Sequence, residues 1–229
     1  FFLFLISIPL LILAFLGFIP GLSDLLAATK PKDLGISYSI EDYSQAHKKT
    51  DIERKIISND YQREFFLSPD NHFIDDTLTS QEVSAWINER TWKHYPFSNL
   101  QIRFNSDNTV EASGNLDVKK FINYIQVLGG MTDTEAQQVS SYMPLSGSPA
   151  FYLNFTGNIQ NNQVELSFSK AKLGNLPISS GLLSSYTPRL VEFIEEKVLN
   201  HPSVNFKELR PDNGLLKVVG TLPDTESVK

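Results

Sequence analysis

The opening segment constrains this chain more than any other feature. No charged side chain occurs before Asp24, and residues 1–20 are almost entirely apolar. At about 1.5 Å per residue, a helix of this length spans the roughly 30 Å of a bilayer core, whereas the apolar part of a signal peptide has about 7–15 residues. The pattern therefore predicts a retained transmembrane anchor over residues 1–28, kinked near Pro9.

The charges after the span bear on its orientation. Lys30 and Lys32 alone would keep the following domain in the cytoplasm by the positive-inside rule. A short basic stretch before the span would reverse this, and we expect that arrangement. The expected location is the cell membrane, with one span and an extracytoplasmic C-terminal domain.

Composition excludes several classes of function. The chain has 20 Lys and Arg against 26 Asp and Glu, a net charge of −6, and lacks the basic face that nucleic-acid binding requires. It has no cysteine, so disulfides, thiolate metal sites and a lipid-modified cysteine are excluded. No protein partner can be named from composition.

A linker and a polar helix are expected over residues 29–60. Pro31 and Gly35 interrupt any helix that continues from the anchor, and Ser39 begins the next one, with Asp42 at the third position of a capping box. The remaining residues, 61–229, are numerous enough to bury a core and are expected to form one domain.

Within that domain, the hydrophobic period alternates between that of helices and that of strands. A weak hairpin is expected from Phe65–Leu67 and His72–Ile74, and a capping box of Thr79 and Glu82 begins a helix. Thr187, followed by Pro188, predicts the start of the last helix. A helix followed by a hairpin occurs three times, over residues 79–118, 119–173 and 180–222.

Hairpins that are apolar on one face must bury that face against helices or other hairpins. The predicted fold class is therefore α+β: an N-terminal transmembrane helix, followed by one domain with a curved, mostly antiparallel sheet packed on amphipathic helices.

Motifs for catalysis or cofactor binding are lacking in the sequence. The four histidines lie far apart, without the close ligand pairs of a zinc site. The serine-rich segments at 146–148 and 179–181 do not match the nucleophile elbow of hydrolases, and Gly129-Gly130 is not followed by the residues of a phosphate loop. We expect no enzyme, no metal and no cofactor.

The segment 172–178 joins the second hairpin to the last helix. Gly174 permits a backbone angle closed to other residues, and Pro177 favours an extended approach to the helix. The segment is interpreted as a connector, with the rim of a ligand site as the alternative.

Three parts of the sequence carry a resemblance: residues 78–83 before a helix, the strand pair 101–104 and 110–114, and residues 173–178 before a helix and the Asp212-Asn213-Gly214 turn. Over about residues 75–222, the chain resembles uncharacterised, membrane-anchored bacterial envelope proteins related to tubular lipid-binding (TULIP-like) proteins. The resemblance implies a long helix wrapped by a strongly bent antiparallel sheet, with an apolar groove for acyl chains and no catalytic residues. The lack of cysteine departs from the lipoprotein members.

The resulting hypothesis is a membrane-anchored, non-enzymatic envelope protein that binds lipid or another apolar ligand between helix and sheet. The side chains expected to line the groove are Phe151, Leu153, Phe155, Leu176, Leu190, Phe193 and Ile194. For each of them, an ordinary dry core is the alternative. Two other functions stay open, a ligand-free scaffold or interaction module of the cell envelope and, less favoured, an envelope hydrolase.

Overall fold

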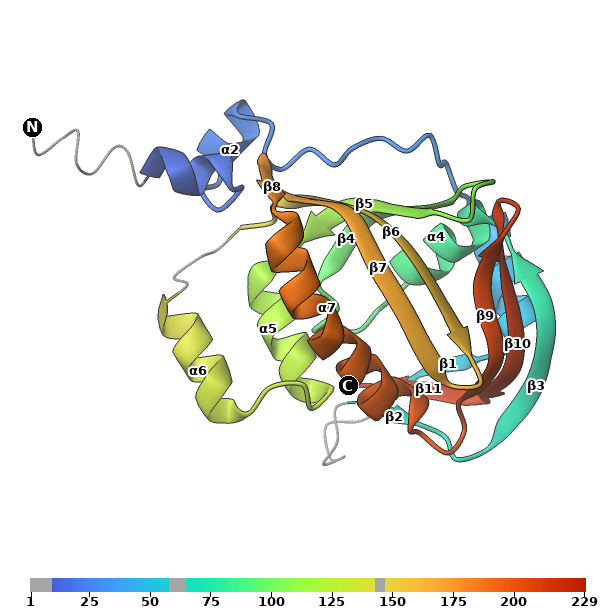
Figure 1. Cartoon of the computed structure of the whole chain (residues 1–229). Coiled ribbons are helices and arrows are strands. Elements are labelled where there is room, and N and C mark those ends of the chain that lie inside the picture. The colour runs from blue at the N-terminus through green and yellow to red at the C-terminus, as the bar shows by residue number, and fades with distance from the viewer. Residues whose placement is uncertain (1–9, 58–64, 143–146) are drawn as a thin grey trace, which may run out of the picture.

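The computed structural model describes residues 10–57, 65–142 and 147–229 (Figure 1). Its helices are α2 (Leu22–Leu25), α3 (Ile40–Thr50), α4 (Ser80–Asn88), α5 (Val118–Val127), α6 (Asp133–Tyr142) and α7 (Ser180–Ile194), which continues into a π-helical turn, η1 (Glu195–Leu199). Its strands are β1 (Glu53–Ile56), β2 (Phe65–Leu67), β3 (Asn71–Leu78), β4 (Phe97–Phe104), β5 (Val110–Leu116), β6 (Ala150–Gln160), β7 (Gln163–Leu173), β8 (Leu176–Ile178), β9 (Asn205–Asp212), β10 (Leu215–Pro223) and β11 (Thr225–Val228).

The N-terminal segment corrects the prediction of a transmembrane anchor over residues 1–28. Residues 10–15 are helical, but the chain turns at Gly17, whose φ is +93°, and only the four residues of α2 are helical after it. Among the described residues, none of the helices has both the length and the apolar character that a membrane span needs. The transmembrane part of the fold class and the single-pass membrane location are therefore wrong. The predicted kink at Pro9 lies outside the described residues.

Close backbone contacts hold this segment against the sheet. Asn175 donates from its backbone N to the carbonyl of Phe15 at 3.1 Å and from Nδ2 to the carbonyl of Leu26 at 2.7 Å. Gly174 has a φ of +54°, and a Cβ there would lie 2.5 Å from the Leu16 carbonyl oxygen. Residues 15–28 thus pack at the end of β6, β7 and β8, which is why the chain turns back where a continuous helix was expected.

The larger sheet is antiparallel and strongly bent. Its order is β3-β10-β9-β6-β5-β4, and β7 pairs with β6 and with β8. Along one edge, β6 pairs first with β5, over Ala150–Phe155, and then with β9 through Ile159 and Gln160. Because β5 and β9 share this edge, the sheet divides into two wings that meet along β6, as Figure 1 shows.

The smaller sheet corrects a second prediction. It has the order β1-β11-β2 and is mixed, with β1 parallel and β2 antiparallel to β11. Since β2 pairs with β11 and β3 with β10, Phe65–Leu67 and His72–Ile74 do not form a hairpin. The turn between them bonds to the C-terminal strand instead, because Ser68 N donates to the Thr225 carbonyl at 2.9 Å. The domain is thus α+β, as expected, with one antiparallel and one mixed sheet.

The capping predictions were confirmed for α3 and α4 but not for α7. Ser39 and Thr79 accept from the backbone N–H three residues on, each within a capping box. In α7, Ser179 is the N-cap and Pro188 lies inside the helix rather than at its start. A proline inside a helix removes one helical hydrogen bond. The helix is therefore two turns longer at its N-terminus than predicted.

Helix α4 covers the edge of the larger sheet. Ser80, Ser84 and Asn88 form one stripe of this helix and bond to the backbone of β4: Ser80 Oγ accepts from Phe104 N at 3.0 Å, Ser84 Oγ from Ile102 N at 2.9 Å, and Asn88 Oδ1 from Leu100 N at 3.0 Å. An uncovered edge strand would offer these groups to another chain. The stripe takes the place of a further strand.

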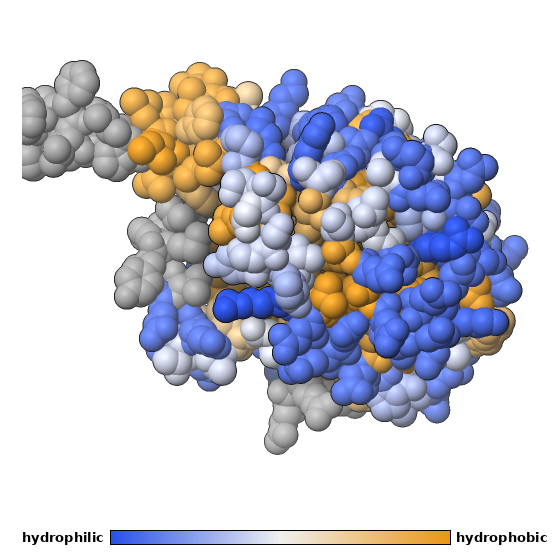
Figure 2. Space-filling model, in the orientation of Figure 1, coloured by the Kyte–Doolittle hydropathy of each residue, from blue (hydrophilic) through white to orange (hydrophobic). Residues whose placement is uncertain are grey.

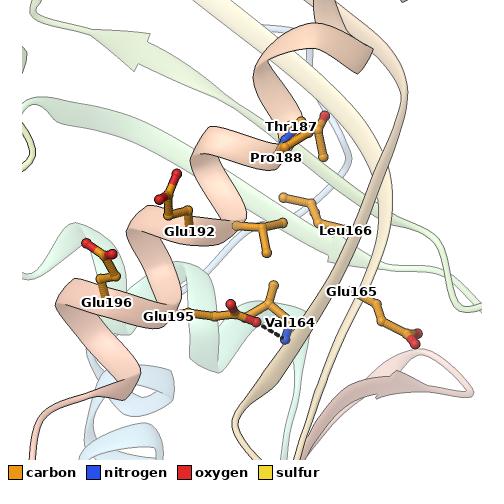
Figure 3. A pocket seen from close by; sticks show the side chains of 9 residues that line it. Val164, Glu165, Leu166, Thr187, Pro188, Glu192, Glu195 and Glu196 are labelled. Atoms are coloured by element: carbon orange, nitrogen blue, oxygen red, sulfur yellow. Dashed lines mark hydrogen bonds between the residues drawn. The ribbon is translucent and has the colours of Figure 1, made fainter.

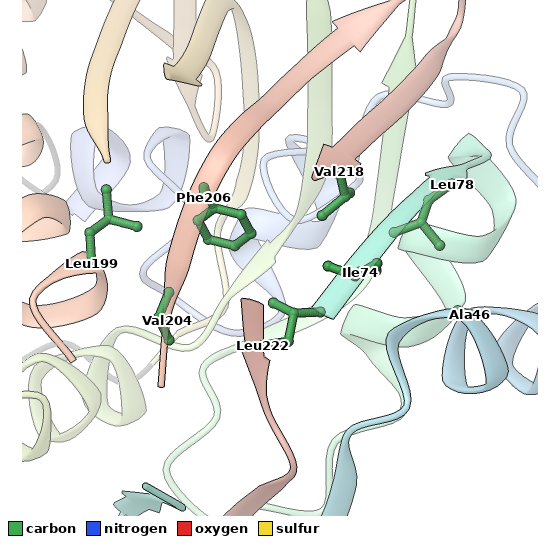
Figure 4. Close-up of a cluster of buried hydrophobic side chains, with 8 residues drawn as sticks. All are labelled: Ala46, Ile74, Leu78, Leu199, Val204, Phe206, Val218 and Leu222. Atoms are coloured by element: carbon green, nitrogen blue, oxygen red, sulfur yellow. The ribbon is translucent and has the colours of Figure 1, made fainter. Parts of the chain in front are cut away.

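The core lies between the β3-β10-β9 wing and the helices (Figure 4). Its buried members come from α3, β3, η1, the loop after η1, β9 and β10: Ala46, Ile74, Leu78, Leu199, Val204, Phe206, Val218 and Leu222. Ile159, Val164 and Ile194 pack against this cluster while only partly buried. The core therefore extends from the β3-β10-β9 wing toward α7, where burial becomes incomplete.

Candidate ligand groove

Helix α7 lies over β7 without a tight seal. None of its fifteen residues, all within the described part of the chain, is buried, although the helix runs alongside β7 in Figure 1. The side chains of β7 that face it, Val164, Leu166 and Phe168, are only partly buried. Packed protein interiors leave few voids larger than a water molecule. The incomplete burial on both sides therefore marks a groove.

The groove has a volume of about 650 Å³ and runs between α7 and β7 (Figure 3). Figure 3 shows Leu166 pointing toward the helix and Glu165 pointing away from it. Figure 2 shows apolar surface between α7 and β7, flanked by hydrophilic residues. The residues that line the groove are Val164, Glu165, Leu166, Thr187, Pro188, Val191, Glu192, Glu195 and Glu196.

A second, deeper hollow adjoins the groove. It measures about 240 Å³ and shares Val164, Glu165 and Leu166 with the groove. Its other walls come from both wings of the sheet and from the end of α7: Ile102, Phe104, Val110, Phe155, Gly157, Asn158, Ile159, Ile194, Leu209, Arg210, Pro211 and Leu216. The bend along β6 creates this hollow, because the two wings diverge from the strand that they share. Ligand sites of about 300–1,000 Å³ with mostly apolar walls are typical of proteins.

The structure places two of the predicted groove residues in these walls, Phe155 and Ile194. Phe151 instead packs against Phe97, with ring centroids 5.8 Å apart, and Leu153 is paired in register with Ala112 and Ala171.

The other three predicted residues lie on α7 and β8, away from the two cavities. Leu176 and Leu190 are 47% and 39% exposed. Phe193 points toward Gly130, where an added Cβ would lie 2.6 Å from its ring. Among the predicted residues of α7, only Ile194 therefore meets the hollow.

Val164, Leu166 and Val191 were missed as lining residues. The alternation over residues 164–168 identified an apolar face. It could not identify the element opposite that face, because the start of α7 was misplaced and the helix was expected to present other residues.

The charged groups of the groove are acidic. Glu195 Oε1 accepts from Val164 N at 2.9 Å, the dashed line in Figure 3, and this bond ties α7 to β7 at one end of the groove. Glu192 and Glu196 leave the helix one turn apart. Glu165 points away from the helix and accepts from Asn158 Nδ2 at 2.8 Å. Of the four glutamates, only Glu195 therefore bridges α7 and β7.

Another cavity, of about 350 Å³, lies between α5, η1 and the smaller sheet. Its charged groups are partnered: Arg90 pairs with the buried carboxylate of Glu226, and Lys197 Nζ lies 3.9 Å from Glu196 Oε2. Arg54 stacks on Trp86, its guanidinium carbon 3.6 Å from the ring centroid, and burial lowers its pKa to about 10. These charged groups thus have partners within the fold.

Metal binding and hydrolysis have little support in the described residues. In the described ranges, no group of three or more His, Cys, Asp or Glu is placed to hold a metal. His201 Nδ1 lies 2.7 Å from Ser203 Oγ, but Ser203 is fully buried and the pair shapes a tight turn. A nucleophile needs access to its substrate, so this pair is not arranged for hydrolysis.

Comparison with known proteins adds no relative: no family model, no curated protein and no solved structure matches this chain. The resemblance to TULIP-like proteins therefore stays a prediction, and function must be argued from the groove.

Proposed function

We propose that this protein binds an elongated apolar ligand between α7 and β7, with an alkyl chain in the hollow beneath, and carries out no reaction on it. The observation that supports this most is the incomplete burial of α7, whose fifteen residues include none that is buried over an otherwise apolar sheet face. An alkyl chain would complete that packing.

The expected driving force is hydrophobic. Each methylene group that leaves water contributes about 0.8 kcal/mol, so six buried methylenes would contribute roughly 5 kcal/mol before the cost of association. Such a ligand would also cover apolar surface that the protein otherwise leaves to solvent. A gain of about 5 kcal/mol corresponds to a Kd of about 0.2 mM, so binding no tighter than the sub-millimolar range is expected for a chain of this size.

The test uses N-phenyl-1-naphthylamine, a neutral apolar fluorophore, with the full chain. Val191→Trp should fill the groove and weaken probe binding about tenfold, because the larger side chain occupies the lining. Leu190→Trp is the matched control, since its neighbouring position on the helix is exposed and outside the groove. Absence of probe binding, or equal loss in both variants, would contradict the proposal.

An interaction module is the second candidate. Leu182, Tyr186 and Leu190 follow one another at intervals of four on α7, and they are 49%, 57% and 39% exposed. Residues at this spacing share a helix face, and such a stripe suits a protein partner. If the stripe binds the probe, Leu182→Ser with Tyr186→Ser will abolish fluorescence enhancement and Val191→Trp will preserve it.

A further inference from the structure

The cavity between α5, η1 and the smaller sheet offers a second place for a ligand. Its volume of about 350 Å³ falls in the range typical of ligand sites. The rings of Phe65, Trp92, Tyr124 and Phe206 stand in its largely apolar wall. None of its described lining residues also lines the groove or the hollow that adjoins the groove. A ligand bound here would therefore be independent of the proposed function.

Two guanidinium groups beside this cavity share one carboxylate. Arg90 Nη1 donates to Glu226 Oε1, and Arg54 Nε lies 3.8 Å from Glu226 Oε2. Burial and the positive charge of Arg90 lower the pKa of Arg54 to about 10, so both guanidiniums stay protonated at neutral pH. Lys197, the other basic side chain of the wall, lies beside Glu196. Within the described part of the chain, the two arginines therefore carry one positive charge more than the acid between them.

Three hydrogen-bond donors of the described residues lack an acceptor at the same place. Arg54 Nε, Arg54 Nη2 and Trp92 Nε1 are buried and form no hydrogen bond, and Trp92 as a whole is 4% exposed. Arg54 donates through Nη1 instead, to the carbonyl of Glu89 at 2.7 Å. Burying a donor without an acceptor costs free energy that an acceptor would recover. Both side chains line a small hollow of about 20 Å³ that shares Arg90, Trp92 and Glu226 with the cavity. The excess charge and the unused donors therefore coincide.

We propose that this cavity binds an apolar carboxylate, with its hydrocarbon part among the aromatic rings and its carboxylate group at the small hollow, where Arg90, Arg54 and Trp92 donate to it. Two guanidiniums would then face two carboxylates. A neutral ligand would leave the excess charge unmatched, and a cation would add to it. A water molecule fits a hollow of about 20 Å³ and is the alternative occupant, but water would also leave the charge uncompensated.

The first test compares octanoate, 1-octanol and octyltrimethylammonium, each added to the full ¹⁵N-labelled chain below its own aggregation concentration. The chain has two tryptophans, Trp86 and Trp92, so two indole N–H signals are expected, and Trp86→Phe assigns them. Octanoate should shift the Trp92 signal downfield in a saturable way, because a charge-assisted hydrogen bond forms there. Octanoate should bind at least about tenfold more tightly than the alcohol, and the cation should bind more weakly than either.

The second test removes the charge of Arg90. Arg90→Gln should weaken octanoate binding at least about tenfold and leave 1-octanol binding within about twofold. Arg189→Gln, at an exposed position of α7 outside the cavity, removes an equal charge and should leave octanoate binding unchanged. Val198→Phe changes no charge at a lining position that is 40% exposed, and it should weaken octanoate and 1-octanol alike by filling the cavity. This variant keeps the site testable if Arg90→Gln does not fold.

A saturable shift of the Trp92 signal, with a preference for octanoate that Arg90→Gln abolishes and Arg189→Gln preserves, would support the proposal. No shift with octanoate, equal affinities for octanoate and 1-octanol, or equal losses in the two arginine variants would overturn it, and a water molecule would then be the sufficient occupant of the small hollow. The groove is tested separately with N-phenyl-1-naphthylamine and Val191→Trp, so failure at this cavity would leave the proposed function standing.

Discussion

At the scale of single residues, Glu111 has the densest set of polar contacts in the larger sheet. It lies on β5, on the face opposite Val110 and Ala112, and is 4% exposed. Its carboxylate accepts from Lys32 Nζ at 2.8 Å, from Tyr152 Oη at 2.6 Å and from Arg103. Because Lys32 belongs to the segment expected to be a linker, Glu111 fastens that segment to the sheet.

These contacts set the protonation of Glu111. Burial by itself would raise the pKa of this carboxyl, but the hydrogen bonds from Lys32, Tyr152 and Arg103 lower it to about 2, from an ordinary value of 4.5. A folded-state pKa below the unfolded one contributes stability that is present above the unfolded value and lost as the pH falls through the folded value. The contribution of Glu111 is therefore complete at neutral pH and is lost between about pH 4.5 and 2.

Glu111→Gln should lower the free energy of unfolding at pH 7 by about 1–3 kcal/mol, because Lys32 and Arg103 lose their buried anionic partner. The variant should also flatten the decline in stability between pH 4.5 and 2. Urea titrations at pH 7 and pH 3 measure both effects, with the exposed Glu41→Gln as control. An unchanged acid dependence would contradict the role assigned to this residue.

At the scale of secondary-structure elements, the pairing of α4 with β4 can be tested most sharply. Asn88 bridges the two elements: its Nδ2 donates to the carbonyl of Leu100 at 2.7 Å and its Oδ1 accepts from the N–H of Leu100. These two bonds satisfy backbone groups that the edge strand would otherwise leave open.

Asn88→Ala should destabilise the protein by about 1–3 kcal/mol, since Leu100 is buried and its backbone groups would lose their partners. Gln81→Ala, at an exposed position of the same helix, should cost less than about 0.5 kcal/mol. Hydrogen exchange at the amide of Leu100 should accelerate only in the first variant. Equal stability of the two variants would show that α4 does not cap the sheet edge.

Elements with strong local signals were predicted best. The hairpins around Asp107-Asn108, Asn161-Asn162 and Asn213-Gly214 all form, because each turn has residues that accept a positive φ and each flank alternates. The start of α7 was misplaced because Thr187-Pro188 imitates a helix start, whereas Ser179 provides the real cap. The apolar run of residues 1–20 was read as one helix, but Gly17 turns the chain within it.

At the scale of the whole molecule, the groove depends on pairings that local patterns do not contain. The pairing of β6 with both β5 and β9 along one edge depends on contacts between residues far apart in the sequence, such as Ile159 with Leu209. The hollow exists only because of that shared edge. Phe155 and Ile194 were therefore identified as apolar residues near a helix and sheet, while Val164 and Val191, which line the groove, were not.

The central claim, an alkyl ligand between α7 and β7, is tested most directly by methyl NMR on the full chain labelled at Ile, Leu and Val. Titration with the neutral alcohol 1-dodecanol should shift the methyl signals of Val164, Leu166, Val191 and Ile194 and leave Val228 on the smaller sheet unchanged. Shifts confined to Leu182 and Leu190 on the outer face of α7, or no saturable shifts at all, would contradict the account.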